Sequence, residues 1–246
     1  MLANKTIWLV GASEGIGRAL AILLAEKGAK LVLSARNADR LQSLLHELPG
    51  EGHGLAPCDV ADTSSIAAAW ETVRALAPDM VIYNAGTYEP MSADAMDLPV
   101  IEKIIDINLH GMLRVLSHIV PFFTARRHGH IALVGSIAGY RGLPGAIGYS
   151  LSKAAVISLA ESLVCDLRRY GIGVQVINPG FVKTRLTQKN DFEMINIVTP
   201  KLAAQRIVRD LGKKKFEIRF PWAFTTLFKI FRLLPYALYF KIMAKK

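Results

Sequence analysis

The sequence predicts an α/β protein with a doubly wound parallel sheet of about seven strands and helices on both faces. Short apolar runs alternate with longer segments whose apolar residues recur at helical spacing, from residue 6 to about residue 220. This alternation is typical of βαβ units, whose crossover helices cover both faces of a parallel sheet. No linker, internal repeat or break in composition precedes about residue 213. We therefore expect a single domain over residues 1–220 and a C-terminal extension over residues 221–246.

The expected elements follow one another in a regular order. Short apolar runs ending in a turn predict strands within residues 6–10, 30–35, 52–57, 79–86, 130–136, 173–180 and 213–220. Helical spacing predicts helices at 17–28, 38–48, 63–77, 98–127 and 148–170. Gly28 is a C-cap signal for the first helix, and the fourth is expected to bend or break between Asn108 and Gly111.

The positive charge of the chain is concentrated at its end. The 246 residues carry a formal net charge of +10, but nine Lys and Arg residues and one acid, Glu217, fall within residues 213–246. A nearly neutral body with a basic tail does not favour a nucleic-acid-binding protein. The two cysteines and six histidines show no metal-site or disulfide spacing, and no apolar run near residue 1 is long enough for a signal peptide. We expect no metal and a cytoplasmic location.

The first strand runs directly into the glycine-rich segment GASEGIG, residues 11–17. Backbone N–H groups at such a strand-to-helix junction, together with the positive end of the helix, can hold a pyrophosphate. The spacing G-x-x-x-G-x-G differs from the more familiar G-x-G-x-x-G, and a tight turn without ligand is the alternative. The residues expected to contact a dinucleotide here are Gly11, Ser13, Glu14, Gly15, Ile16 and Gly17.

The end of the second strand indicates which dinucleotide is bound. An acidic residue there would accept hydrogen bonds from the adenosine ribose, whereas this sequence has Arg36. A guanidinium suits a phosphate dianion, so we expect NADP(H) rather than NAD(H). The alternative is that Arg36 only faces solvent, and Glu14 between the glycines is a counter-signal.

Three side chains with complementary chemistry are expected at one edge of the sheet. Tyr149 and Lys153 lie at i and i+4 near the start of a helix, and Ser136 ends the preceding strand. Reduction of a carbonyl group by hydride needs a proton donor for the developing oxyanion. A phenol with a pKa of ~10 is a slow acid–base group, and a neighbouring ammonium is expected to lower that pKa. Ser136 would hold the carbonyl oxygen by a hydrogen bond.

These motifs together resemble the short-chain dehydrogenase/reductase family in its form of roughly 250 residues. They occur in order over residues 4–220, as GASEGIG, CDV (58–60), NAG (84–86), Asn108, Ser136, YSLSK (149–153) and PGFVKT (179–184). The resemblance implies a Rossmann-type fold and a homodimer paired through the helices at about 98–127 and 148–170.

The resemblance also implies a role for each matching residue. Asn108 would bend its helix and hold a water linked to Lys153, which would also bind the nicotinamide ribose. Further cofactor contacts would come from Asp59, Val60, Asn84, Ala85, Gly86, Pro179, Gly180, Val182 and Thr184, besides Tyr149 and Lys153. Catalysis would rest on Asn108, Ser136, Tyr149 and Lys153, and the substrate would contact Ser136, Ile137, Tyr140 and Tyr149. Two departures, Val10 for Thr and Tyr83 for Asn, are expected to loosen hydrogen bonds at the sheet edge.

The C-terminal extension combines aromatic, apolar and basic residues. No stretch of 18 uncharged apolar residues exists that could span a bilayer. On a helix over 222–234, four polar residues form one stripe and apolar residues fill the rest, which is typical of an interfacial anchor. We expect peripheral membrane contact through residues 222–246, at the inner face of a membrane. The alternative is a helix packed on the sheet or on a second subunit.

The function expected from these features is NADPH-dependent reduction of a ketone, with Tyr149 as the proton donor. The segment 185–200 is expected to be a lid with apolar residues over an apolar or lipid-like substrate, such as a 3-oxoacyl, retinoid or steroid-like compound. One alternative is an NAD(P)+-dependent alcohol dehydrogenase working in the oxidative direction. Another is a non-catalytic NADP-binding scaffold at a membrane surface.

Overall fold

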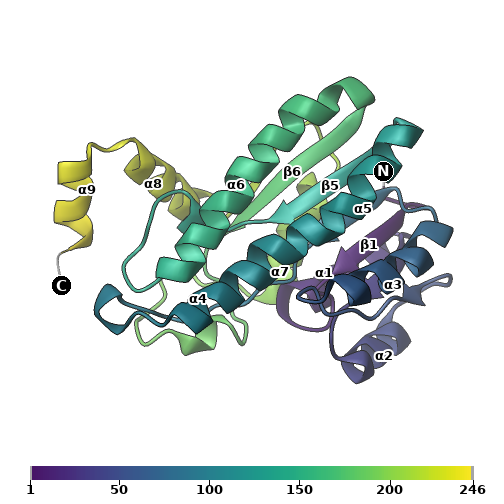
Figure 1. The fold of residues 1–246 in the computed structure, drawn as a ribbon, viewed down its shortest axis with the longest axis horizontal. Coiled ribbons are helices and arrows are strands. Elements are labelled where there is room, and N and C mark those ends of the chain that lie inside the picture. Colours follow the sequence, from purple (N-terminus) through teal and green to yellow (C-terminus); the bar gives the residue numbers. More distant parts are fainter. Residues whose placement is uncertain (1, 245–246) are drawn as a thin grey trace.

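The computed structural model describes residues 2–244, which form a seven-stranded parallel sheet in the order β3-β2-β1-β4-β5-β6-β7 (Figure 1). This arrangement confirms the predicted fold class. The strands are β1 (Thr6–Val10), β2 (Lys30–Ser34), β3 (Gly54–Leu55), β4 (Met80–Tyr83), β5 (Gly129–Val134), β6 (Ile172–Pro179) and β7 (Glu217–Phe220). The helices are α1 (Gly15–Glu26), α2 (Ala38–Glu47), α3 (Thr63–Ala75), α4 (Leu98–Ile105), α5 (Gly111–Arg126), α6 (Ile147–Leu167), α7 (Pro200–Asp210), α8 (Trp222–Leu233) and α9 (Tyr236–Met243).

Two apolar cores cover the two faces of the sheet. Successive residues of β1 point to opposite faces, so Trp8 belongs to one core and Leu9 to the other. The core that contains Trp8 packs against α3, α5 and α6, and the core that contains Leu9 packs against α1, α2 and α7. Both residues are fully buried, which explains why the strands appear in the sequence as continuous apolar runs.

The sequence did not lead us to expect α7, although its start carries a strong local signal. Thr199 is the N-cap and accepts a hydrogen bond from the N–H of Leu202 at 3.2 Å, and Pro200 occupies the first helical position. The α7 helix packs against α1 and closes the second core.

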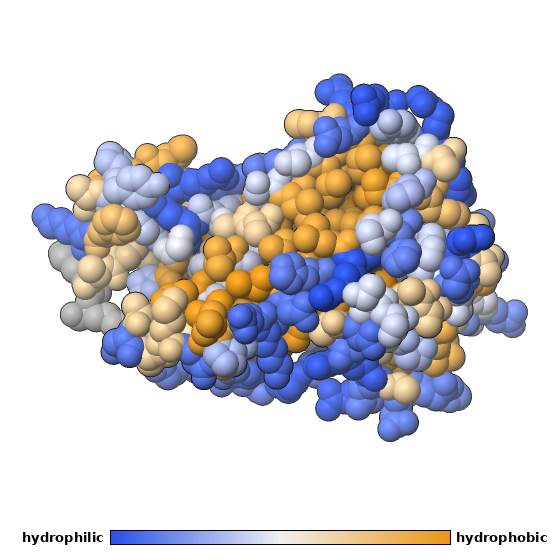
Figure 2. Space-filling view, in the orientation of Figure 1, coloured by the Kyte–Doolittle hydropathy of each residue, from blue (hydrophilic) through white to orange (hydrophobic). Residues whose placement is uncertain are grey.

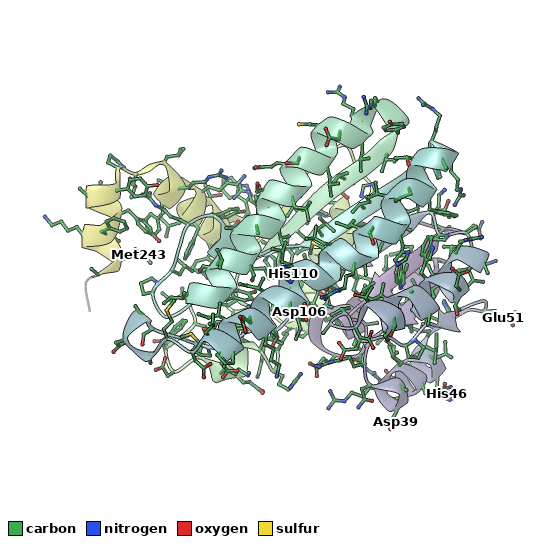
Figure 3. The ribbon with its side chains drawn as sticks, in the orientation of Figure 1. Asp39, His46, Glu51, Asp106, His110 and Met243 are labelled. Carbon is green, nitrogen blue, oxygen red and sulfur yellow. The ribbon has the colours of Figure 1, made fainter. Side chains whose placement is uncertain are left out.

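The predicted bend of the fourth helix is a short π-helical segment, Asp106–His110, between α4 and α5. Figure 3 labels Asp106 and His110 on this segment. The Asp106 carboxylate accepts a hydrogen bond from Arg114 at 2.7 Å, which ties the segment to the following turn of α5. The extra residue in the turn places Asn108, which is fully buried, within hydrogen-bonding distance of Thr87 and Ser152.

Among the described residues, one helix is long and apolar enough to span a bilayer, by length and composition only. It covers Ile147–Tyr170 and includes α6. Val156, Ile157 and Ala160 of this helix are buried in the core beside the sheet. The segment is therefore a core helix of the fold.

The C-terminal extension is folded as α8 and α9, joined at Pro235. Most of the polar stripe of α8 faces the protein: Thr225 is fully buried, and Lys229 forms an ion pair with Glu217 of β7, whereas Arg232 is exposed. The rest of the face turned to solvent is mostly apolar. Its most exposed members are Trp222, Ile230 and Leu233, together with Tyr236 and Phe240 of α9.

Candidate active site

The four side chains expected to be catalytic converge at the carboxyl-terminal edge of the sheet. Ser136 lies two residues beyond β5, Tyr149 and Lys153 lie in the first turns of α6, and Asn108 lies in the π-helical segment. In an open parallel sheet this edge is where ligands bind.

Tyr149 is held in a protonated state by its surroundings. Burial raises the pKa of the phenol to about 12, a hydrogen bond with Ser136 acts in the opposite direction, and the neighbouring Tyr88 adds to the rise. The net lowering of this pKa expected from the sequence is not present, because burial dominates. The Lys153 ammonium lies 5.7 Å from the centre of the Tyr149 ring.

Lys153 is buried beside the tyrosine without an acidic partner. Its ammonium donates a hydrogen bond to the carbonyl oxygen of Val134 at 2.8 Å, and the residue is 4% exposed. Burial lowers the pKa of Lys153 to about 8. A cation that is close to its titration point at neutral pH responds strongly to any charge formed nearby.

Asn108 connects the bent helix to the loop after β4. Its Oδ1 accepts the N–H of Thr87 at 2.7 Å, and its Nδ2 donates to the Thr87 carbonyl and to Ser152 Oγ, both at 3.0 Å. A Cβ atom on Gly86 would lie 3.3 Å from Asn108 Oδ1 and 3.7 Å from Lys153 Nζ. Glycine at position 86 therefore lets the loop pass close to both groups.

Steric constraints explain why two positions of the glycine-rich turn, Gly11 and Gly17, are glycines. Gly11 has φ +85°, and a Cβ atom there would lie 2.4 Å from the backbone nitrogen of Ala85. A Cβ atom on Gly17 would lie 2.0 Å from the Gly11 carbonyl oxygen, which also accepts a hydrogen bond from Asn84 at 2.7 Å. Ser13 and Ile16 are partly buried in this turn. The NAG segment and the glycine turn thus form one packed unit.

The N-terminus of α1 remains open toward the sheet edge. Its N-cap residue, Glu14, makes no side-chain capping bond, and no acidic residue lies in the first turn. A Cβ atom on Gly15 would come within 3.1 Å of Thr184 Cγ2, so the segment after β6 lies against this turn. Pro179 ends β6, Gly180 donates to the Phe220 carbonyl at 2.8 Å, and Val182 is buried.

The charges around the nucleotide edge are partly paired with each other. Glu14 binds Arg40 at 2.8 Å and Arg185 at 2.7 Å, so this acid joins the glycine turn to α2 and to the segment after Thr184. Arg36 lies exposed at the end of β2. Asp59 accepts the N–H of Ala61 at 3.0 Å in the turn before α3, and Val60 is buried behind it.

Two neighbouring cavities lie at this edge of the sheet, and Tyr149 lines the inner one. The inner cavity, of about 120 Å³, is mostly apolar and is lined by Tyr88, Ser136, Ile137, Ala138, Leu143, Pro144, Ala146, Tyr149, Gly180, Phe181, Leu186, Thr187, Asn190 and Phe192. The outer cavity, of about 690 Å³, shares Tyr88, Pro144, Asn190 and Phe192 with it. The segment 185–200 therefore contributes residues to both cavities.

Tyr140 is placed away from these cavities, contrary to expectation. Its hydroxyl donates to Glu217 Oε1 at 2.5 Å, the side chain is 6% exposed, and it is absent from the lining of either cavity. The hydrogen bond with the Glu217 carboxylate holds the Tyr140 ring near β7, whereas Ile137 lines the inner cavity as expected.

Sequence reasoning overlooked Tyr88, which packs edge-on against Tyr149 with ring centres 5.0 Å apart. Its position two residues after the NAG segment is the signal that could have revealed it.

Tyr83 also differs from its expected effect. Its hydroxyl donates to the carbonyl oxygen of Ile107 at 2.7 Å, and the side chain is 1% exposed. The tyrosine therefore braces the bent helix against β4 and does not loosen this region. Val10 is fully buried in the core.

Comparison with known proteins agrees with this geometry. A family model described as short chain dehydrogenase matches residues 5–194, and the chain belongs to the short-chain dehydrogenase/reductase family. It is therefore an oxidoreductase acting on CH–OH or C=O groups, and its family uses nicotinamide cofactors.

Several relatives are similar over most of their length. An uncharacterized oxidoreductase of Myxococcus xanthus is 34% identical over 243 residues, which cover 97% of this chain and 96% of that protein. The 3-oxoacyl-[acyl-carrier-protein] reductase FabG of Buchnera aphidicola is 31% identical and covers 76% of this chain and 77% of its own length. A crystal structure described as a putative betaketoacyl-ACP reductase superposes with a TM-score of 0.75 at 27% identity, covering 85% of this chain and 90% of that one.

Proposed function

We propose that this protein is an NADPH-dependent carbonyl reductase in which Tyr149 donates the proton. The observation that carries the proposal is the environment of Tyr149: a protonated phenol lines an apolar cavity, forms a hydrogen bond with Ser136 and has the Lys153 ammonium 5.7 Å from its ring centre. This environment supports the reductive direction and an apolar substrate.

The residues present fit a nicotinamide dinucleotide. The N-terminus of α1 has no side-chain cap, so its backbone N–H groups are available to a pyrophosphate. Gly11 and Gly17 let the turn pack closely enough against the Asn84–Ala85 segment to present those groups. Lys153 lies beside Gly86 in the middle of the sheet edge, where it would hold ribose hydroxyl groups. Asn84, Ala85, Pro179, Gly180, Val182 and Thr184 would complete this binding surface.

A bound reduced nicotinamide would supply the hydride that the carbonyl carbon accepts. Ser136 orients the carbonyl oxygen by a hydrogen bond, and Tyr149 donates its phenolic proton to that oxygen as negative charge develops. The charge then rests on the tyrosine oxygen, where the Lys153 ammonium stabilises it. Asn108 holds the loop after β4 in place through Thr87.

The oxidative direction is a weaker candidate. An alcohol dehydrogenase would need Tyr149 ionised as a base, and burial raises the pKa of this phenol to about 12. The protonated phenol suits reduction near neutral pH. A non-catalytic scaffold is weaker still, because all four catalytic side chains are present and converge.

The choice of NADPH rests on Arg36, which is exposed at the end of β2 with no acid at that strand end. Titrating the protein with NADPH and NADH while following nicotinamide fluorescence tests it. We expect NADPH to bind at least about tenfold more tightly, and Arg36→Asp to abolish the difference because a phosphate would then face a carboxylate.

Lys27→Asp makes the same charge change at the exposed C-cap of α1 and should leave the preference intact. Equal binding of both nucleotides to the unmodified protein would reject the NADPH assignment and bring the oxidative alternative forward.

The substrate we infer is an apolar carbonyl compound. The inner cavity is lined by Phe181, Phe192 and Leu186, and the polar groups that face it converge near Tyr149. The name of the Buchnera relative indicates a 3-oxoacyl substrate for that protein, and 3-oxoacyl, retinoid or steroid-like ketones are candidates for this one. Efficient reduction of small polar ketones beside poor reduction of long-chain ones would reject this class.

Two further contacts belong to the proposal. Leu113 of α5 and Leu151 of α6 are exposed. Figure 2 shows an apolar band over these helices, and we infer that it pairs two subunits. Light scattering that gives the mass of a single chain would reject a dimer.

The apolar outer face of α8 and α9 is proposed to contact the inner face of a membrane, with the rest of the protein in the cytoplasm.

A further inference from the structure

The C-terminal extension contacts the backs of two walls of the inner cavity. Phe181 and Phe192 form one wall, and Leu143 and Pro144 form the other. Each wall is supported by a different helix of the extension, although α8 and α9 lie far from both segments in sequence (Figure 1). The contacts are made by the inward face of the extension, opposite its exposed apolar face.

The first support is an aromatic chain that begins in α8. The Phe224 ring lies 5.7 Å from the Phe181 ring, and Phe181 lies 5.8 Å from Phe192 in an edge-to-face arrangement. A Cβ atom on Gly180 would lie only 3.0 Å from Phe224 Cδ1, so the glycine leaves room for this ring. Phe228 continues the chain, 5.0 Å from Phe224. The position of Phe181 in the cavity is therefore set from behind by α8.

The second support is a clamp formed by Arg141 and Tyr239. Arg141 donates to the carbonyl oxygens of Phe231 at 2.6 Å and Leu234 at 2.8 Å, which end α8, and its guanidinium lies 4.0 Å from the centre of the Tyr239 ring. Tyr239 is 3% exposed and donates its hydroxyl proton to the Gly142 carbonyl at 2.5 Å. The segment that contains Leu143 and Pro144 is thus held against α9 by this hydrogen bond.

We propose that Phe224 and Tyr239 are positioning residues for the substrate: they hold the two cavity walls at the spacing that binds a bulky apolar ketone. This inference rests on the proposed reductase function. The Myxococcus relative matches 97% of this chain, so the similarity reaches into the extension as well as the catalytic body. Neither residue contacts Tyr149 or Lys153, so they should affect substrate binding rather than proton transfer.

Steady-state kinetics with NADPH and two ketones, 2-butanone and 2-decanone, tests the proposal. For Phe224→Ala we expect KM for 2-decanone to rise about tenfold, with kcat and the KM for NADPH within about twofold of the unmodified protein. Leu227→Ala removes a half-exposed side chain from the same helix and is the matched control. Phe224→Leu keeps most of the side-chain volume but removes the aromatic ring, and it replaces the alanine variant in this test if that variant does not fold.

Tyr239→Phe removes only the hydroxyl group that binds Gly142, and it should raise the same KM about threefold. Tyr170→Phe loses the same atom from a residue distant from the cavities and should change neither constant. A fall in kcat without a change in KM, or equal effects in variant and control, would overturn the inference.

Amide hydrogen exchange separates this inference from the proposed reaction. Phe224→Ala should accelerate exchange in residues 181–192, and Tyr239→Phe should accelerate it in residues 141–146, because each wall loses its support. If the unmodified protein reduced no ketone, the proposed reductase function would be rejected, but the exchange rates would still test whether Phe224 and Tyr239 support the cavity walls. Unchanged exchange in both segments would overturn this supporting role.

Discussion

At the scale of single residues, burial controls the chemistry of the catalytic pair. It raises the pKa of Tyr149 to about 12 and lowers the pKa of Lys153 to about 8, because both charged forms lose solvation. At pH 7 the pair therefore consists of a neutral phenol and an ammonium ion. This state is the one required to donate a proton and then stabilise the tyrosinate that remains.

Replacing the phenol should remove the proton donor and little else. We expect Tyr149→Phe to lower kcat for ketone reduction about a thousandfold, since general acid catalysis contributes roughly 10²–10⁴-fold. NADPH binding, measured by fluorescence, should stay within about threefold, because the ring remains. Activity close to that of the unmodified protein would exclude Tyr149 as the donor.

The buried lysine predicts a pH profile. Below pH 8 Lys153 carries the charge that stabilises tyrosinate, and above pH 8 it becomes neutral, so kcat/KM for reduction should fall as the pH rises through about 8. Lys153→Met should be slower at every pH and should lack this inflection. A profile with the same inflection in both proteins would assign it to another group.

At the scale of elements, the attachment of α8 depends on Glu217. This carboxylate accepts hydrogen bonds from Tyr140 and from Asn178, at 2.5 and 2.7 Å, and forms an ion pair with Lys229. Burial would raise the pKa of Glu217, but hydrogen bonds from Lys229, Tyr140 and Asn178 outweigh it and the pKa is lowered. One acid thus joins β7, α8 and the segment after β5.

The variant Glu217→Gln should weaken this attachment. We expect the free energy of unfolding at pH 7 to fall by about 1–2 kcal/mol in urea titrations, because the ion pair is lost at a largely buried position. A carboxyl whose pKa is depressed on folding stabilises above its ordinary pKa and loses that contribution as the pH falls. The difference between the two proteins should therefore shrink as the pH falls below about 4.5.

The matched control for this change is Glu47→Gln. Glu47 binds Arg18 at 2.6 Å on the surface, with half of its side chain exposed, so the loss should stay below about 0.5 kcal/mol. Equal losses for both variants would show that Glu217 has no special role in holding α8.

At the scale of the whole molecule, two apolar surfaces remain uncovered in a single chain. One lies over α5 and α6 (Figure 2), and the other is the outer face of α8 and α9, where Trp222 and Leu233 are exposed. The second surface belongs to a segment whose described part has no acidic residue, so like charges would oppose the pairing of two such faces. An anionic lipid surface suits both its apolar side chains and its cations.

Sedimentation with vesicles of anionic phospholipid tests this contact. We expect the protein to bind them at moderate salt, and the double variant Trp222→Glu, Leu233→Glu to bind at least about tenfold more weakly. Leu76→Glu adds a charge at an exposed leucine, the C-cap of α3, and should bind like the unmodified protein. Full binding by the double variant would reject the membrane contact, and loss of self-association in it would indicate a second subunit instead.

The sequence by itself was sufficient for the features that depend on local spacing. The order of strands and helices follows from apolar periodicity, and the bend near Asn108 was anticipated and is present as a π-helical segment. The convergence of Ser136, Tyr149 and Lys153 also follows, because parallel strands end at the same edge and a helix places i and i+4 on one face.

Only the tertiary structure decided the features that depend on partners distant in sequence. The polar stripe of α8 faces inward because Glu217 and Arg219 of β7 provide its partners, and Tyr140 turns away from the cavity toward the same glutamate. The pKa of Tyr149 is likewise a property of how deeply the folded chain buries it. Periodicity identifies which side chains share a face, but the face that is buried is chosen by what the rest of the chain places opposite it.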